Sequence, residues 1–228
     1  RPPRSTPLYS SAASDVYKRQ GVGTPRTFRP IWTAEELGLA YEHHAIGPRT
    51  GETLTQEYTQ MNPKQKIPFA KDGTVGLSES IAISRYLVTK YASQAGFYMP
   101  AGLIEQAKED EWICYIYGEL DETSLYVMRR HGDLHKIYGS APAAVESSKV
   151  YAEKHLNIID KHMSTTEYVM GEEFGLADII LCSTLDWTHF YGFDLPDNLL
   201  GYRRRIMQRR AYQKAFAVNY PHLKKEKE

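Results

Sequence analysis

The chain has 228 residues, of which 42% are hydrophobic and 25% are charged, and its 28 basic residues are balanced by 28 acidic ones. A net charge of zero argues against a surface that binds nucleic acid, and no apolar run reaches the roughly 18 residues of a membrane-spanning helix. The length suits one large domain or two small ones, in a protein that we expect to be cytoplasmic.

Residues 1–20 show neither helical nor strand periodicity and are rich in proline, serine, alanine and arginine. This composition is typical of a disordered segment or of a leader that is foreign to the natural gene. We therefore expect the folded part of the chain to begin near residue 21.

The next segment, residues 21–92, alternates strand and helix patterns and predicts an α/β domain. A helical pattern that begins near Thr24 stops at Gly38, which is a typical residue just beyond a helix end. The turn Asp72-Gly73 separates two short strands. The expected elements are a helix over 26–37, a strand over 39–46, a short helix over 54–60, strands over 67–70 and 74–77, and a helix over 79–91.

Strand patterns almost vanish after the connector at residues 93–102, so residues 103–228 predict an all-helical domain. The expected helices lie near 103–130, 142–163, 176–191, 198–208 and 210–217. In the first of them Tyr115 and Tyr126 lie on a less apolar face. A basic cluster from Arg203 to Arg210 is interpreted as a solvated helix surface.

The cysteine and histidine patterns do not indicate a redox or metal site. Cys114 and Cys182 lie in apolar helical patterns without a CxxC spacing, so both are expected to be core thiols. His131 and His135 have the i, i+4 spacing of two zinc ligands, but no third ligand stands nearby in the sequence. We expect no metal.

Pro68 lies inside an otherwise ordinary strand pattern, where its missing N–H requires a special backbone geometry. A cis Ile67–Pro68 bond would leave the backbone groups of Ile67 pointing outward, where an extended peptide can pair with them as a strand would. The pattern therefore predicts a small peptide ligand.

Glu79 and Ser80 open the next helix, where free N–H groups and the positive end of the helix dipole favour a carboxylate. The Glu79 side chain can hold an ammonium, so an amino-acid end of a ligand fits there. In the alternative interpretation, Ser78 caps the helix and Glu79 only complements its dipole.

Three stretches resemble the cytosolic glutathione S-transferases of the serine-type classes, such as theta, zeta and phi. They are "TPRTFRPIWTAEELGLAYE" (24–42), "NPKQKIPFAKDGTVGLSESIAISRYL" (62–87) and "GEEFGLADIILCSTLDW" (171–187). The resemblance extends over residues 24–217. It implies a thioredoxin-like N-terminal domain, an all-α C-terminal domain, a homodimer and glutathione as co-substrate.

Residue by residue, the resemblance implies that Ile67 and Pro68 bind the cysteinyl unit of glutathione. Glu79 and Ser80 would hold its γ-glutamyl end, and Lys66 would lie near its glycyl carboxylate. The implied enzyme adds the glutathione thiolate to a small hydrophobic electrophile, as in detoxification. A glutathione-dependent isomerase or peroxidase, or a non-catalytic glutathione-binding regulatory module, remains the alternative.

The catalytic hydroxyl of the family falls here on Thr24, just before the first helix, with Thr27 as the fallback. Thr24 departs from the usual serine, tyrosine or cysteine, and as a residue before a proline it could simply cap the helix. Arg26, Tyr115 and Tyr126 are secondary candidates for the electrophile side of the site.

One conflict concerns the first strand, which the resemblance places near residues 16–22. Lys18 and Arg19 are poor residues for a strand that is buried on both faces. We infer from this conflict that the leader has replaced the start of the natural strand and that the sheet is weakened there.

Overall fold

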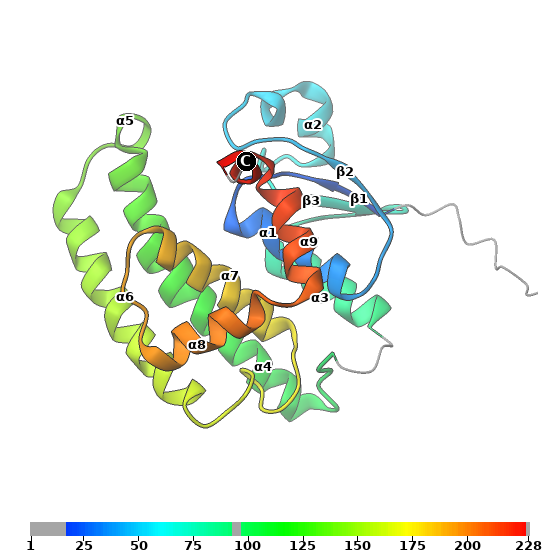
Figure 1. Cartoon of the computed structure of the whole chain (residues 1–228). Coiled ribbons are helices and arrows are strands. Elements are labelled where there is room, and N and C mark those ends of the chain that lie inside the picture. The colour runs from blue at the N-terminus through cyan, green and yellow to red at the C-terminus, as the bar shows by residue number, and fades with distance from the viewer. Residues whose placement is uncertain (1–16, 93–96, 227–228) are drawn as a thin grey trace, which may run out of the picture.

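The computed structural model describes residues 17–92 and 97–226. They form an N-terminal α/β unit and a C-terminal helical unit, so the expected fold class is confirmed (Figure 1). Most of the leader proposed for residues 1–20, and residues 93–96 of the proposed connector, lie outside the described residues.

The N-terminal unit is built on a four-stranded sheet with the strand order β2-β1-β3-β4. Strands β1 and β2 are parallel, whereas β3 pairs antiparallel with both β1 and β4. The bounds are β1 Tyr17–Gln20, β2 Tyr41–His44, β3 Phe69–Asp72 and β4 Val75–Ser78. Helix α2 lies on one side of the sheet, and helices α1 and α3 lie on the other (Figure 1).

Strand β1 corrects the boundary that the sequence suggests for the leader. Composition places residues 17–20 in a leader outside the fold, yet their backbone pairs with Tyr41–His44 on one side and with Phe69–Lys71 on the other. The position that the family register implies for the first strand is therefore correct.

The helices of this unit are α1 Pro25–Glu36, the 3-10 turn η1 Glu52–Leu54, α2 Gln56–Met61 and α3 Ser80–Tyr91. Helix α1 is buried along most of its length and packs against α3, α7 and α9, so it joins the two units. Its rings Phe28 and Trp32 are 1% and 0% exposed, and they belong to a hydrophobic core that continues into α7. The catalytic candidate Thr24 thus stands at the end of a well-supported helix.

The C-terminal unit consists of helices, most of them close to the expected ranges. They are α4 Leu103–Tyr115, η2 Ile116–Tyr126, η3 Arg129–Asp133, α5 His135–Tyr138, α6 Pro142–Met163, α7 Leu176–Phe190, α8 Asp197–Ile206, α9 Arg210–Asn219 and the 3-10 segment η4 Pro221–Glu226. The range of α6 is the one that the sequence predicts.

The single α-helix expected over 103–130 is wrong in one respect. After Tyr115 the chain continues as a π-helix over η2 and again over η3, with the i→i+5 hydrogen bonding of that form. A π-helix turns less per residue than an α-helix, so an α-helical spacing misplaces the side chains beyond Ile116. Tyr115 and Tyr126 consequently do not share one face.

The two cysteines differ in exposure. Cys182 on α7 is fully buried, as expected, but Cys114 on α4 is exposed, which corrects the prediction of a core thiol. Burial raises the pKa of the Cys182 thiol well above its ordinary value. A buried neutral thiol packs as a small apolar side chain.

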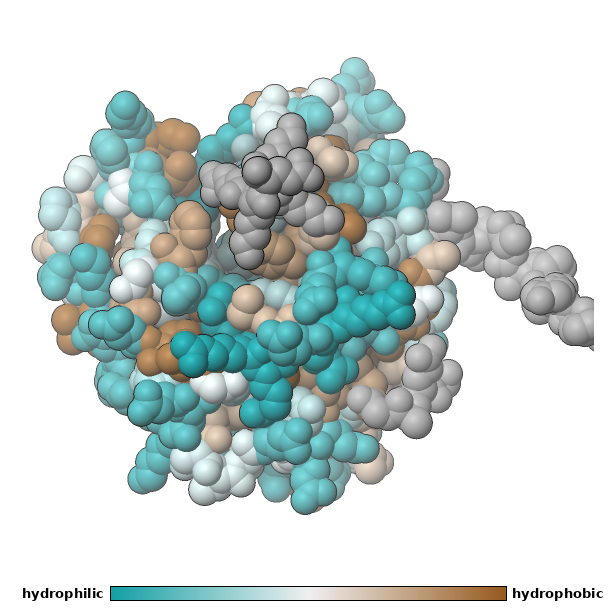
Figure 2. Space-filling model, viewed as in Figure 1, coloured by the Kyte–Doolittle hydropathy of each residue, from teal (hydrophilic) through white to brown (hydrophobic). Residues whose placement is uncertain are grey.

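The basic cluster forms part of the hydrophilic surface in the area of α8 and α9 (Figure 2). Arg203 pairs with Asp186, and Arg209 pairs with Glu36 of α1 at 2.8 Å. Arg204 and Arg210 are exposed.

None of the helices in the described ranges combines the length and the apolar character needed to cross a bilayer.

Candidate glutathione site

The turn into helix α1 is fixed by a reciprocal pair of hydrogen bonds between Thr24 and Thr27. Thr24 is the N-cap, with φ −132° and ψ 154°, and its Oγ1 accepts from the Thr27 N–H at 3.0 Å. The Thr27 Oγ1 in turn accepts from the Thr24 N–H at 3.1 Å. Pro25 occupies the first helical position, where its missing N–H costs nothing. The capping role considered for Thr24 is therefore confirmed.

A capping role leaves the hydroxyl hydrogen of Thr24 available. The two hydroxyl oxygens lie 3.0 Å apart, so one of them can donate to the other. The single hydroxyl hydrogen of Thr27 has two better acceptors, Asn219 Oδ1 at 2.7 Å and the Thr24 carbonyl at 2.8 Å. The hydrogen in the contact between the hydroxyls therefore belongs to Thr24, and it can turn to a ligand.

Thr27 itself is unsuitable as the fallback hydroxyl. Its side chain is buried with 1% exposure, and it faces Asn219 of helix α9. Since its hydrogen is already used inside the protein, a ligand cannot reach it. Of the two threonines, the structure leaves only Thr24 at the surface of the pocket described below.

In the segment from Gln65 to Pro68, the protein itself bonds some of the backbone groups but not those of Ile67. The Ile67–Pro68 bond is cis, and the carbonyl of Lys66 accepts from Tyr58 Oη at 2.7 Å and from Asn62 Nδ2 at 2.8 Å. These two hydrogen bonds fix the position of the Lys66 carbonyl. In the described part of the chain, no backbone partner engages the N–H or the C=O of Ile67. Both groups are free to pair with an extended peptide.

Gly21 allows the Ile67 side chain to lie close to the end of strand β1. Gly21 has φ +122°, and a Cβ added there would lie 2.9 Å from Ile67 Cβ and 2.7 Å from Thr27 Cγ2. Only glycine combines this backbone conformation with such a close approach. The glycine therefore helps to set the distance between Ile67 and the turn that carries Thr24.

Glu79 and Ser80 lie at the start of α3, on the same edge of the sheet as the Ile67–Pro68 bond. The pairing of Ser78 with Phe69 fixes this proximity. Glu79 is the N-cap residue with φ +74°, and its carboxylate pairs with Lys64 at 2.9 Å. The alternative in which Ser78 caps α3 is wrong, because the N-cap is Glu79 and no side chain caps the helix.

Ser80 is 4% exposed, and its Oγ lies 3.5 Å from Nη1 of the buried Arg29. The Arg29 guanidinium also bonds Ser183, Thr184 and the fully buried Asp121, whose Oδ2 is 2.5 Å from Nη2. The start of α3 is thus connected to the interface between the two units.

Arg26 approaches the same carboxylate from the pocket side. It bonds Asp121 and pairs with Glu122 at 3.1 Å. Burial acts to lower the pKa of Arg26, but the charge of Asp121 and the hydrogen bond to it outweigh that effect and raise the pKa. Arg26 therefore stays protonated, and its charge is balanced by these two carboxylates.

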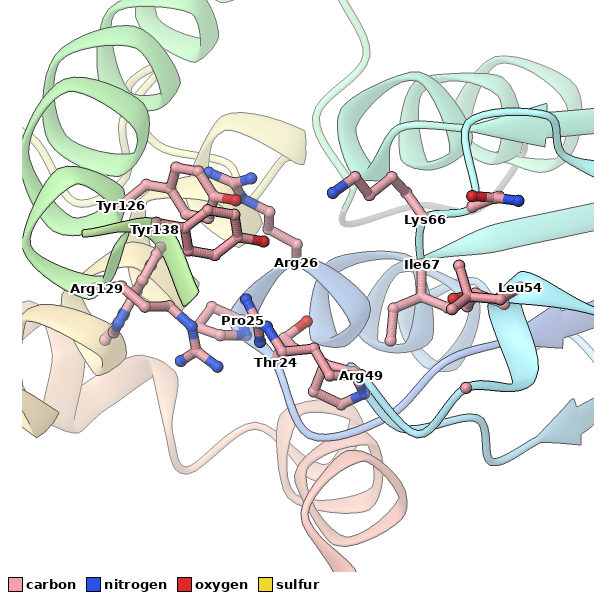
Figure 3. Close-up of a pocket in the computed structure, with 15 residues that line it drawn as sticks. Thr24, Pro25, Arg26, Arg49, Leu54, Lys66, Ile67, Tyr126, Arg129 and Tyr138 are labelled. Carbon is pink, nitrogen blue, oxygen red and sulfur yellow. The ribbon is translucent and has the colours of Figure 1, made fainter. Parts of the chain in front are cut away.

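A pocket of about 390 Å³ opens between the two units, which is within the size range of small-molecule sites. Figure 3 shows Thr24, Pro25 and Arg26 between two walls, with Lys66 and Ile67 on one side and Tyr126, Arg129 and Tyr138 on the other. The lining also includes Arg49, Leu54 and Trp187.

Family models match both units: the glutathione S-transferase N-terminal domain over residues 15–89 and the glutathione S-transferase C-terminal domain over residues 142–224. The chain belongs to the glutathione S-transferase family. It is a family of enzymes, and the pocket lies between the N-terminal domain that the first model matches and the helical unit.

The chain is 29% identical to glutathione S-transferase 3 of Zea mays over 161 residues, which are 68% of this chain and 70% of that one. It is 28% identical to elongation factor 1-gamma 1 of Oryza sativa subsp. japonica over 204 residues, 89% of this chain but only 43% of that protein. A theta-class glutathione S-transferase from Xanthomonas axonopodis pv. citri, solved with glutathione bound, has a TM-score of 0.74 at 24% identity, covering 88% of this chain and 97% of that one.

This pocket brings together only part of the residue set that the sequence suggests. Thr24, Arg26, Lys66, Ile67 and Tyr126 line it, whereas Pro68, Glu79 and Ser80 lie beside it at the sheet edge. Tyr115 lies elsewhere, since its hydroxyl contacts His155 Nδ1 at 2.7 Å. Tyr126 stacks under the Arg26 guanidinium at 4.5 Å from the ring centre.

No sequence pattern indicates that Arg49 and Arg129 line this pocket or that Asn219 bonds Thr24 and Thr27. Each of them lies outside the three stretches that carry the family resemblance.

The two histidines with the spacing of zinc ligands are engaged elsewhere. His131 and His135 donate from Nδ1 to the carbonyls of Gly139 and Gly132. Within the described ranges, no cluster of three or more histidine, cysteine or acidic side chains could hold a metal.

Proposed function

We propose that the chain is a cytoplasmic, homodimeric glutathione transferase that stabilises the glutathione thiolate with Thr24 and adds its sulfur to a small electrophile. The observation that carries this proposal is the position of the Thr24 hydroxyl and the free backbone groups of Ile67 in one pocket. The glutathione bound to the Xanthomonas enzyme supports the choice of ligand.

In the proposed binding mode, the cysteinyl unit of glutathione pairs with the Ile67 backbone and directs its sulfur to Thr24. The γ-glutamyl end lies at the start of α3, with its ammonium at Glu79 and its carboxylate at Ser80 and the helix N-terminus. The glycyl carboxylate lies near Lys66, a cation with no carboxylate partner among the described side chains.

The chemistry requires a thiolate at neutral pH, and a free thiol has a pKa of about 8.5. A reduction by two units corresponds to roughly 2.7 kcal/mol. A hydrogen bond to a charged group supplies about 1.5–3 kcal/mol, and a helix N-terminus adds about 0.3–1 kcal/mol. The hydrogen bond from Thr24 thus makes the largest contribution, and the N-terminus of α1 assists.

In the reaction, the thiol proton passes to solvent and the sulfur lone pair forms a bond to an electrophilic carbon. A leaving group then departs with its electron pair, or the electrons move into a conjugated acceptor. Arg26 is already paired with Asp121 and Glu122, so it does not act as an acid here. Isomerisation and peroxide reduction use the same thiolate, so these activities remain alternatives at the same site.

The experiment is a titration of the ultraviolet thiolate absorbance of bound glutathione against pH. We expect Thr24→Ala to raise the midpoint by about 1–2 units, and Thr24→Ser to keep it low. Thr55→Ala is the matched control, because Thr55 caps α2 by accepting from Tyr58 N at 3.2 Å but does not line the pocket. Equal midpoints for the parent and Thr24→Ala would remove Thr24 from the mechanism.

A non-catalytic glutathione-binding module is the second candidate. The similarity to elongation factor 1-gamma 1 over 89% of this chain favours it, as does a threonine at the hydroxyl position. Retention on immobilised glutathione, combined with no turnover of any electrophile, peroxide or isomerisation substrate, would select this candidate.

A further inference from the structure

Positive charge is concentrated at the pocket. The chain has equal numbers of basic and acidic residues, yet the pocket lining contains Arg26, Arg49, Lys66 and Arg129 and, among the described residues, no aspartate or glutamate. Asp121 and Glu122 neutralise Arg26. The other three cations have no ion pair with a carboxylate whose side chain the structure describes.

The three cations without an ion pair lie on different walls. Arg49 and Lys66 are exposed and belong to the thioredoxin-like unit, on the side of Ile67 (Figure 3). Arg129 is half-buried and belongs to the helical unit, where it lies beside Tyr126 and Tyr138 (Figure 3). The buried ring of Trp187 also lines the pocket. Arg129 is therefore a cation set among aromatic rings.

Local backbone structure supports the placement of this wall. Tyr126 ends the first π-helical segment and Arg129 begins the second. The π-helix is rare in proteins, and the short π-helical turns that do occur are often found at functional sites. The neighbouring Arg130 lies over the Tyr138 ring at 5.0 Å and supports it. The π-helical segments thus bring an aromatic ring and a guanidinium to the same side of the pocket.

Glutathione alone does not account for all three cations. Its γ-glutamyl end has both of its charges matched at Glu79 and Ser80 in the proposed binding mode, and its glycyl carboxylate is assigned to the two cations of the thioredoxin-like unit, Lys66 and Arg49. Arg129 remains, on the opposite wall, where the second substrate must lie. A half-buried cation without a carboxylate partner favours an anionic group on whatever binds there.

We propose that the second substrate is an organic acid: an electrophilic aromatic or unsaturated carbon framework with a carboxylate that Arg129 binds. The framework lies against Tyr126, Tyr138 and Trp187, and the carboxylate accepts from the guanidinium. This inference rests on the proposed function, because it assumes that glutathione fills the Ile67 side of the pocket.

The probe pair is 4-chloro-3-nitrobenzoate and the neutral 4-chloro-3-nitrobenzamide, which have the same reactive carbon. In each reaction the glutathione sulfur bonds to the ring carbon that bears chlorine, chloride leaves with the bonding electrons, and the thiol proton goes to solvent. We expect the benzoate to have the higher kcat/KM, and Arg129→Met to reduce that value on the order of tenfold while the benzamide is little affected.

Binding of the two conjugates provides a readout that does not depend on turnover. S-(4-carboxy-2-nitrophenyl)glutathione should bind more tightly than its carboxamide counterpart, and Arg129→Met should abolish the difference. Arg49→Met should weaken both conjugates equally, since its proposed partner is the glycyl carboxylate. Arg204→Met, which removes an exposed charge on α8, is the control for net charge and should change neither.

Two failures are distinguishable. Equal affinity of the two conjugates for the parent protein, or an equal loss for both in Arg129→Met, would overturn the assignment of Arg129 and leave glutathione binding intact. Failure of glutathione and of both conjugates to bind the parent protein would overturn the proposed function, and the assignment of Arg129 with it.

Discussion

Asn219, near the C-terminal end of the described chain, donates from Nδ2 to the carbonyl of Thr24 at 3.0 Å. Because a carbonyl can only accept, this bond fixes the orientation of the amide, and Oδ1 faces the Thr27 hydroxyl at 2.7 Å. The carbonyl of Asn219 also accepts from the Gly23 N–H at 2.8 Å. A residue 195 positions away along the chain therefore holds the turn that carries the proposed catalytic hydroxyl.

We expect Asn219→Ala to reduce the free energy of unfolding by about 1–3 kcal/mol, since it removes two side-chain hydrogen bonds, one to the Thr24 carbonyl and one from the Thr27 hydroxyl. The thiolate midpoint of bound glutathione should also rise, because the turn is no longer held. Urea unfolding and the thiolate titration measure the two effects. Asn157→Ala, at an exposed position of α6, should change neither.

The buried pair between Arg29 and Asp121 gives a second prediction. Asp121→Asn should cost about 3–5 kcal/mol in the free energy of unfolding, because it leaves the guanidinium of Arg29, which is 0% exposed, without a counter-charge. The matched control is Asp110→Asn, which removes a half-exposed partner of Arg85 and should cost at most about 1 kcal/mol. Similar losses for the two variants would contradict this assignment.

Gly21→Ala tests the close approach to Ile67. The added Cβ would lie 2.9 Å from Ile67 Cβ, so the ligand-binding segment must shift, and we expect glutathione affinity to fall on the order of tenfold or more. Gly38→Ala is the control: its φ is also positive, +63°, but no atom lies within 4 Å. It should lose about 1–2 kcal/mol of stability and keep its affinity.

Asp178 gives a prediction on pH. Its carboxylate accepts from the N–H of Gly175, the N-cap of α7, at 2.8 Å, and from the N–H of Val169 in the preceding loop at 2.9 Å. Burial nevertheless raises the pKa of Asp178 to about 6, whereas an aspartate in an unfolded chain has a pKa of about 3.9. The folded state therefore binds the proton more tightly than the unfolded state, so stability should fall as the pH rises from about 4 to about 6.

The measurement for Asp178 is the free energy of unfolding of the parent minus that of Asp178→Asn, as a function of pH. The asparagine does not titrate, so this difference should decrease between about pH 4 and about pH 6 and then become constant. A difference that increases with pH over the same range would show that the hydrogen bonds to the carboxylate outweigh its burial.

Much of the first unit could be predicted from the sequence because its signals are local. Pro25 after Thr24 indicates a helix start, Gly38 indicates a helix end, and Asp72-Gly73 indicates a tight turn. Pro68 inside a strand pattern predicts the cis bond that the structure has, although Pro68 itself lies just before β3, which begins at Phe69 and not at residue 67. Each of these features depends on the backbone preferences of one or two neighbouring residues, which the sequence alone determines.

Only the tertiary structure decided which residues meet at the pocket. The bond between Asn219 and Thr24 depends on the packing of α9 against α1. The position of Arg129 across the pocket from Ile67 depends on how the helical unit packs on the first unit, and no local pattern encodes either arrangement. The π-helical segments moved Tyr126 into the pocket and left Tyr115 against His155, where an α-helical spacing placed them on one face. Local propensity is a property of neighbouring residues, whereas these contacts arise when distant segments bury their surfaces together.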